Sequence, residues 1–457
     1  RELAQSLGCP LLQVETNVVV PVRAASTRLE PAAATLRPRL LRLLPRFLQP
    51  VPAVPLERPG HAAAVGLRER LAAAGISELD IADADAALAS LDLDRSAPRV
   101  PGWRGGPAAA LKRLEAFAQK HIAQYHQKRK DPAAQCQSQL SPYLRFGQVS
   151  TLQVLLWLQQ HGMAPQAEAW AEELVVRREL ARNMVLYNPE GYDAYDSAVP
   201  RWARLSLQGH ASDARPRRFS PEDLELGRTD DDAWNAAQHE MLASGHMHNY
   251  MRMYWCKQLL LWTASPREAF ETACRLNDRW ELDGRDENGY MGIAWCFGNH
   301  DNEFPERPVF GTVRCMTRSG LKGKVDVAKY AEVVRKKCTF ALSQDARYGS
   351  LLPRPKGILG FFSGTPRQQT TPSKPPASKA AAASGEAAGG KGAAGLSPPK
   401  TGPPAGATAG TLAAAGAERG ACAGPGDRRP PLPEKLEASA VARGKRPREE
   451  EECVIVG

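Results

Sequence analysis

The sequence predicts an α/β fragment, then an all-α domain, then a low-complexity tail. Three observations predict this class: a β-branched run between helix-like segments near the start, long helical periodicity after residue 107, and a change of composition near residue 365. All nine Trp lie between Trp103 and Trp295, and no aromatic residue follows Thr365. The later part therefore cannot build a core. We divide the chain into an α/β fragment (1–52), an interdomain linker (53–107), a helical domain (108–337) and a disordered tail (338–457).

Composition narrows the function classes. The formal net charge of +10 and the pI near 9.2 suit a polyanionic partner such as DNA. Nine Cys without a CxxC pair argue against a disulfide framework or a zinc site, and favour a reducing compartment. No apolar run approaches the roughly 18 residues that span a membrane. We expect a monomer with no membrane partner, and a sequence that begins inside a longer protein.

The first 107 residues predict the fragment and the linker. The run ETNVVVPVRAAS (15–26) is typical of a buried strand. Helix-like RELAQSLG (1–8) precedes it and an amphipathic segment (33–48) follows, and such alternation indicates a parallel sheet. Segment 53–107 is rich in Pro and Ala, so we predict an exposed and partly helical crossing.

Helices are predicted over 108–129, 151–161 and 166–186. Another should begin within QSQLSPYLRFGQVS (137–150), with Ser141 as N-cap and Pro142 at the first helical position. The hydroxyl of Ser138 adds a donor to that end, which suits a pyrophosphate site, although an ordinary capped helix is the commoner interpretation of such a segment taken alone. In the longest helix, Glu173 is predicted to pair with Arg177 on a charged face.

The densest chemistry lies in 234–307. The segment HNYMRMYWCKQLLLW (248–262) predicts a buried helix, on which Trp255 and Trp262 are seven residues apart. This spacing suits either a core stripe or an electron-transfer chain. His246 and His248 are too close together to be ligands on one helix face, so we assign no metal.

A polar run follows, DGRDENG (283–289), directly before the apolar residues from Tyr290 onward. Buried charges must be paired. We therefore predict a loop that holds a polar ligand, with Arg252 as partner of Asp283 or Asp286. The alternative is an exposed acidic turn.

Three motifs, HMHNYMRMYW, LNDRWELDGRDENGY and HDNEFPERPVFG, closely resemble the class II cyclobutane pyrimidine dimer photolyases of the photolyase and cryptochrome superfamily. The resemblance covers about 18–335. It implies the end of a Rossmann-like antenna domain, an all-α FAD-binding domain, and light-dependent repair of DNA by electron transfer from reduced FAD to a flipped-out dimer. The antenna chromophore is not identified.

The resemblance also implies roles for individual residues. Glu173 would face the dimer, Asn277 the flavin N5, and Trp295 with Met253 the dimer pocket. Trp255, Trp262 and Trp234, in that order outward, would reduce the flavin in light. The implied FAD contacts are Tyr125, Ser138, Leu140, Ser141, Arg252, Asn277, Asp283, Arg285 and Asp286.

DNA contacts are implied after residue 300. Phe304 would fill the hole left by the flipped dimer, with Arg307 and Arg314 on phosphates or orphaned bases. Lys322 and Lys324 would add phosphate contacts. The sequence departs from the family here, because Phe304 stands where a Trp is expected and the GNHD segment is one residue short.

The tail offers short motifs. Ile358, Phe361 and Phe362 have the spacing of sliding-clamp ligands, although Pro355 replaces the usual Gln. The triplet Val454, Ile455 and Val456 after four Glu resembles a SUMO-interacting motif, and the basic residues Lys445, Arg446 and Arg448 suit nuclear import. An inert solubilising end is the alternative.

For the whole chain, a cryptochrome-type photoreceptor and a catalytically decayed DNA-repair scaffold stay open as alternatives.

Overall fold

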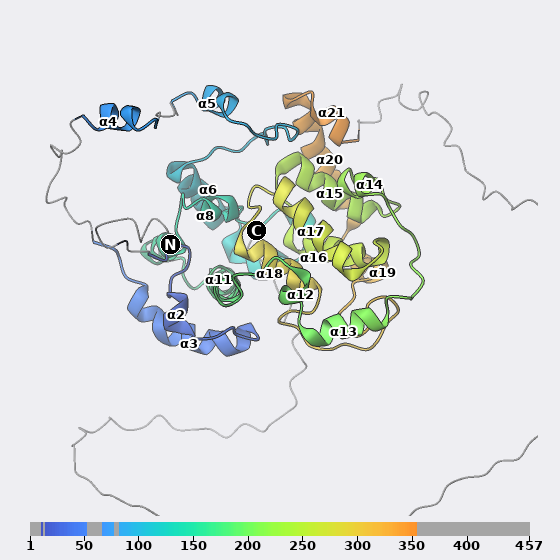
Figure 1. Cartoon of the computed structure of the whole chain (residues 1–457). Coiled ribbons are helices and arrows are strands. Elements are labelled where there is room, and N and C mark those ends of the chain that lie inside the picture. The colour runs from blue at the N-terminus through green and yellow to red at the C-terminus, as the bar shows by residue number, and fades with distance from the viewer. Residues whose placement is uncertain (1–10, 12–13, 53–65, 77–81, 354–457) are drawn as a thin grey trace, which may run out of the picture. The chain divides into compact units, whose positions relative to one another are not determined.

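The computed structural model describes residue 11 and residues 14–52, 66–76 and 82–353 (Figure 1). Within these ranges the regular elements are helices, and the only bridge is the isolated one between Arg307 and Gly311. The helices are α2 Val22–Ala25, α3 Ala33–Phe47, α4 Leu67–Ala73, α5 Ala84–Ser90, α6 Pro107–Lys120, η2 Ile122–Gln124, α7 Tyr125–Lys128, η3 Pro132–Ala134, α8 Ser141–Arg145, α9 Thr151–Gln160, α10 Glu168–Ala171, η4 Glu172–Arg177, α11 Arg178–Tyr187, α12 Tyr195–Ala198, α13 Arg201–Gly209, α14 Pro221–Glu225, α15 Asp232–Ser244, α16 Asn249–Trp262, α17 Pro266–Trp280, α18 Glu287–Cys296, α19 Arg318–Lys322, α20 Val327–Gln344 and α21 Tyr348–Leu351.

The strand predicted over 15–26 is wrong. Val18, Val19 and Val20 are buried as expected, but the backbone bends there and α2 begins directly afterwards. In a sheet, these backbone amides would donate to a neighbouring strand. Here Val19 N and Val20 N donate instead to one carboxylate oxygen, Glu179 Oε1, at 3.2 and 3.0 Å. The described residues therefore give no support to the α/β fragment.

The main core surrounds α16. Helices α15, α17 and α18 pack against it, and α20 lies along α15 (Figure 1). Nearly every α16 side chain is buried, as expected of a central helix that is apolar around most of its circumference. A second core joins α6, α8 and α9 through Phe117, Tyr143 and Val154.

Helix limits follow the predictions in three places and depart in four. The helix predicted over 108–129 is broken, because α6 ends at Lys120 and the 3-10 turn η2 and the short α7 follow. Helices α3, α9 and α16 match the predicted ranges to within a residue or so. In 166–186, a π-helical turn over Glu172–Arg177 separates α10 from α11. Ser141 is the first residue of α8 rather than its N-cap, a position that Leu140 holds without a side-chain bond. The tail does not start at residue 338, because α20 runs on to Gln344 and α21 buries Tyr348.

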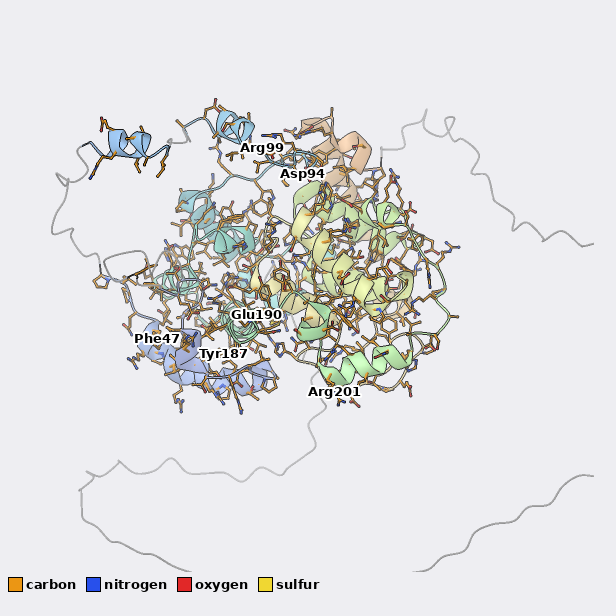
Figure 2. The ribbon with its side chains drawn as sticks, viewed as in Figure 1. Phe47, Asp94, Arg99, Tyr187, Glu190 and Arg201 are labelled. Carbon is orange, nitrogen blue, oxygen red and sulfur yellow. The ribbon has the colours of Figure 1, made fainter. Side chains whose placement is uncertain are left out.

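Long-range polar contacts tie the first hundred residues to the helical part. Tyr187, at the end of α11, donates to Ser26 O at 2.7 Å, and Arg279 of α17 contacts Asp94 at 3.0 Å (Figure 2). Helices α4 and α5 fall in the predicted linker, where most described side chains are exposed. None of the described helices is both long and apolar enough to cross a bilayer.

Candidate functional site

Three tryptophans form one contact chain beside α16. Trp234 of α15 stacks on Trp255 with ring centroids 6.1 Å apart and planes 10° apart, and meets Trp262 edge-on at 5.2 Å. Trp234 is fully buried, whereas Trp262 is 5% exposed. The predicted outward order Trp255, Trp262, Trp234 is wrong, because Trp234 is the middle ring. Residues seven apart on a helix lie roughly 10 Å apart along its axis, so Trp255 reaches Trp262 through a ring from another helix.

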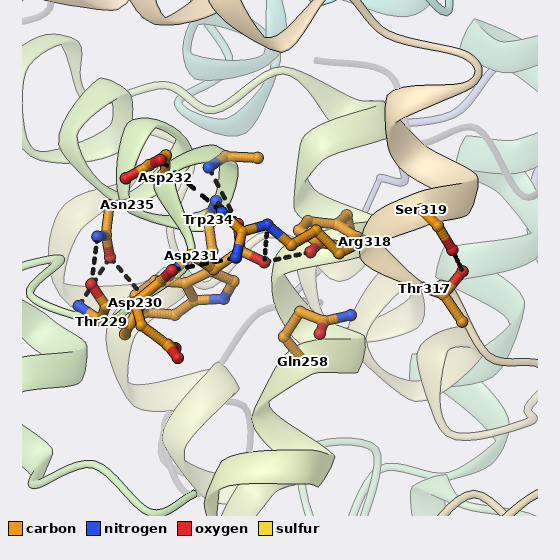
Figure 3. Close-up of polar contacts among 12 residues, drawn as sticks. Thr229, Asp230, Asp231, Asp232, Trp234, Asn235, Gln258, Thr317, Arg318 and Ser319 are labelled. Carbon is orange, nitrogen blue, oxygen red and sulfur yellow. Dashed lines mark hydrogen bonds and ion pairs between the residues drawn. The ribbon is translucent and has the colours of Figure 1, made fainter. Parts of the chain in front are cut away.

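Bonds to backbone and side-chain oxygens fix these rings. The indole N–H of Trp234 donates to Trp255 O at 2.9 Å, and that of Trp255 to Gln238 Oε1 at 2.8 Å. Asp231 caps α15 by accepting from Trp234 N at 3.1 Å, and also accepts from Tyr254 Oη at 2.5 Å. Figure 3 shows Asp231 next to Trp234 and Arg318. Arg318 Nε lies 3.9 Å from Asp231 Oδ2.

The polar run after α17 is buried and paired with arginines. Arg252 Nη2 lies 3.0 Å from Glu281 Oε1 and 3.7 Å from Asp283 Oδ1, so Arg252 is a partner of Asp283 as predicted, with Glu281 closer. Asp286 is paired with Arg178 of α11 at 3.3 Å, and both side chains are buried. Arg285 is exposed with φ +66°, so the structure leaves its side chain outside this buried group.

Several buried polar atoms near this run have no hydrogen-bond partner in the protein. They are Ser141 Oγ, Asn249 Oδ1, Arg252 Nε, Asn277 Oδ1, Asp283 Oδ1 and Asn288 Oδ1. Helices α16, α17 and α18 pack on one another, and α8 reaches the same run through Arg145 Nε, 3.4 Å from Gly284 O. Leaving a buried polar atom unpaired costs about 1–3 kcal/mol. So many together indicate a surface built to bind a polar ligand.

The remaining predicted cofactor residues differ in their surroundings. Ser138 and Leu140 are buried before α8, and Leu140 N lies 3.4 Å from Ser138 Oγ. Asn277 is held by Asp278 Oδ1, which accepts from Asn277 Nδ2 at 3.1 Å. A Cβ at Gly289 would approach Asn277 Nδ2 to 3.0 Å, so α18 passes close to this amide because it carries a glycine there.

Glu173 lies on the π-helical turn and is buried, not on a solvated face. Its carboxylate accepts from Tyr125 Oη at 2.5 Å and is ion-paired with Arg129, so the predicted Arg177 partner is wrong. Burial raises the pKa of Glu173 to about 7, although the Tyr125 and Arg129 contacts act in the opposite direction. Glu173 can therefore hold a proton near neutral pH.

Trp295 on α18 is buried between two cations. Lys257 Nζ lies 5.2 Å and Arg314 Cζ 5.4 Å from its ring centroid. Met253, predicted beside Trp295, is buried on α16, and its carbonyl oxygen is 3.9 Å from Cys296 Sγ.

The residues predicted to contact DNA all lie between residues 304 and 324, but they differ in exposure and in partners. Phe304 is half-buried over the Arg314 guanidinium, 4.3 Å from ring centroid to Cζ, and Asp301 holds Arg314 through contacts of 3.1 and 3.2 Å. Arg307 is exposed. Lys322 and Lys324 are exposed and line an open cavity of about 880 Å³ with Arg318 and Asp232.

Sequence reasoning missed Arg178, Arg129 and Lys257. Lys257 carried a signal, because it is a charged residue inside the apolar segment MYWCKQLLLW. The others look like ordinary surface residues in the sequence. The predictions for Ile358, Phe361, Phe362, Lys445, Arg446, Arg448, Val454, Ile455 and Val456 lie outside the described residues.

Sequence comparison identifies relatives over most of the chain. This chain is 41% identical over 336 residues to the deoxyribodipyrimidine photo-lyase of Methanothermobacter thermautotrophicus, and the match covers 73% of this chain and 70% of the relative. Identity is 38% to the protein of the same name from Oryza sativa subsp. japonica (72% and 64% covered) and 39% to that from Potorous tridactylus (70% and 58% covered). No protein-family model matches the chain. On the first of these similarities, the chain belongs to the deoxyribodipyrimidine photo-lyase family.

Proposed function

We propose that this protein repairs cyclobutane pyrimidine dimers in DNA in light, with FAD bound between α8 and the packed helices α16, α17 and α18. The observation that carries the proposal is the group of buried polar atoms without partners beside a chain of three touching indoles. Photo-lyase relatives of similar sequence support it. The finer assignment to class II rests on the three motifs.

The residues present fit FAD as the cofactor. Unpaired hydroxyl and amide oxygens at Ser141, Asn277 and Asn288 offer partners to a ligand rich in donors and acceptors. Arg178 and Arg252 supply buried positive charge for phosphates, while Asp286 and Asp283 keep each of them compensated. The bound cofactor supplies light-driven transfer of a single electron.

The protein's own groups orient and protect that chemistry. Asp278 holds the Asn277 amide so that Oδ1 remains an acceptor, and the buried indoles of Trp234 and Trp255 provide a dry route for electrons from Trp262 toward the cofactor. Tyr125 and Arg129 hold the two carboxylate oxygens of Glu173, and burial raises its pKa to about 7, so that Glu173 could take up a proton beside a carbonyl oxygen of the dimer. Trp295 offers an aromatic face to a flipped base.

For DNA, we propose that Phe304 enters the duplex and that Arg307, Lys322 and Lys324 contact phosphates. Arg314, already held by Asp301, would support Phe304 and meet orphaned bases. We also propose, from the tail motifs alone, a nuclear protein whose tail binds the sliding clamp and SUMO.

One assay tests the proposal. Purified protein, reconstituted with FAD and chemically reduced, is mixed with irradiated duplex DNA, and cyclobutane dimers are counted in light and in darkness. We expect loss of dimers only in light. FAD binding with photoreduction but without repair would indicate a photoreceptor, and neither FAD binding nor repair would indicate a decayed scaffold.

A further inference from the structure

Lys257 is a buried cation in the middle of α16. Its Nζ donates to Cys296 O at 2.9 Å and to Arg314 O at 2.6 Å, and the residue is 0% exposed. Burial lowers the pKa of Lys257, but two carbonyl oxygens and the face of Trp295 surround the ammonium group and favour its charged form. Burying a charged group lowers the stability of the fold. We therefore ask what the charge of Lys257 does to the side chains around it.

The neighbour most affected is Trp295. Arg314 lies on the same indole at 5.4 Å, but Asp301 offsets part of its charge, whereas the atoms bonded to Lys257 Nζ belong to neutral carbonyl groups. Asp301 also acts on Lys257, but only Arg314 is in direct ion-pair contact with it, so Lys257 is the less compensated charge at Trp295.

The three tryptophans of the contact chain have the opposite surroundings. In the part of the chain that the structure describes, no cation lies over the rings of Trp234, Trp255 or Trp262. Instead, the indole N–H groups of Trp234 and Trp255 donate to oxygens, and the buried carboxylate of Asp231, with Arg318 3.9 Å away, caps the helix at Trp234. An indole that loses an electron becomes positive, so nearby cations oppose the loss and nearby oxygens favour it.

We propose that Lys257, assisted by Arg314, keeps Trp295 from giving up an electron, so that electrons reach the cofactor only through Trp255. This rests on the proposed function. With FAD bound, Trp255 would give one electron to the light-excited oxidised flavin, Trp234 and then Trp262 would refill the vacancy in turn, and a soluble thiol would reduce Trp262. The thiol would become a thiyl radical and release its S–H proton to solvent, no bond of the protein would form or break, and Trp295 would stay neutral beside the substrate pocket. Lys257 is thus a positioning residue that acts through Trp295.

Flash absorption of the FAD-loaded full chain in a Trp255→Phe background tests this. Trp255→Phe alone is expected to give almost no tryptophan radical. Adding Lys257→Met is expected to raise the radical yield at least about fivefold, because it removes the opposing charge. Adding Trp295→Phe as a third change should abolish that gain, and the charge-conserving Lys257→Arg should not produce it.

An unchanged radical yield in the Trp255→Phe/Lys257→Met protein overturns the proposal, as does a gain that survives Trp295→Phe. Flavin absorbance is measured first, so that failure to retain FAD counts against the proposed function and not against the role of Lys257. If circular dichroism shows that the Lys257→Met protein is unfolded, Arg314→Met in the same background decides. A smaller gain is expected there, and no gain overturns the proposal.

Discussion

Single residues in this molecule are best understood through the partners that burial imposes on them. Arg178 and Asp286 are both buried, and each would be very costly alone. The same holds for Glu240, which is fully buried and accepts from Tyr330 Oη at 2.6 Å and from Lys337 Nζ at 2.6 Å. Polar atoms of the proposed cofactor surface depart from this rule, which is the observation that supports the proposed site.

Trp234 tests the order of the contact chain. Because Trp234 separates Trp255 from Trp262, Trp234→Phe should lower the rate of flavin photoreduction by more than about tenfold. Repair by chemically reduced protein should stay close to the unmodified level. Trp157→Phe is the matched control, since Trp157 stacks on His161 outside the chain. Equal photoreduction in the Trp234→Phe and Trp157→Phe proteins would contradict the order.

His210 should make the segment around Val309 sensitive to pH. Its ring lies 2.7 Å from both Asp213 Oδ2 and Glu306 Oε1, and Asp213 also accepts from Val309 N, whose φ of +68° is strained for a β-branched residue. Hydrogen bonding to Asp213, then to Glu306, raises the pKa of His210.

A raised histidine pKa stabilises the fold fully below about pH 6.5 and loses that contribution as pH rises through the folded-state value. Proteolysis within 302–311 should therefore increase as pH rises above 6.5. The His210→Gln protein should show less of this increase. An identical pH profile in both proteins would exclude a role for His210 in holding this segment.

At the scale of elements, side chains of α11 accept from and donate to the backbone of residues 17–20, which a neighbouring strand would do in the predicted α/β fragment. Glu179 accepts from two consecutive backbone amides of 18–20, and Arg178 Nε donates to Asn17 O at 2.9 Å. The π-helical turn before α11 carries Glu173 to Tyr125 and Arg129. π turns of this kind are frequent at functional sites.

Glu179→Gln tests the anchoring of 18–20. Burial raises the pKa of Glu179 to about 8, so the folded protein binds a proton there that the unfolded chain releases near pH 4.5, and stability falls as pH rises between these values. The neutral amide still accepts from Val19 N and Val20 N. We expect Glu179→Gln to stabilise the fold by on the order of 2 kcal/mol at pH 8 and to flatten this pH dependence, measured by urea unfolding. Destabilisation at pH 8 would show that the charged form is required.

For the whole molecule, the net positive charge should contribute to the affinity for DNA and to the salt dependence of binding. A charge of +10 favours a polyanion, and each phosphate contact adds to the salt dependence of binding. The pairing of Arg314 with Asp301 makes Arg307 the better phosphate contact, because Arg307 is exposed.

Arg307→Ala should weaken binding to duplex DNA containing a dimer. The slope of log K against log salt should fall in magnitude by about 1. Arg42→Ala, which removes an exposed arginine from α3, should leave the slope nearly unchanged. Slopes measured by fluorescence anisotropy that agree for the two variants would remove Arg307 from the interface.

The sequence by itself determined the elements whose information is local. Helical patterns of apolar residues and helix formers predicted α3, α9 and α16, because hydrogen bonds four residues apart depend on nearby side chains. The run of charges at 283–289 predicted a buried polar group and a partner in Arg252, since charges inside a protein must be paired.

Only the tertiary structure decided which distant groups meet. The strand prediction at 15–26 is wrong because a run of three valines is equally compatible with pairing to a strand and with packing on a helix. The amides of Val19 and Val20 donate instead to the buried carboxylate of Glu179, 159 residues after Val20. The middle place of Trp234, the Arg178–Asp286 pair and the cations on Trp295 likewise join separate helices. Such contacts depend on how helices pack, and that information is spread over the whole core rather than carried by any one segment.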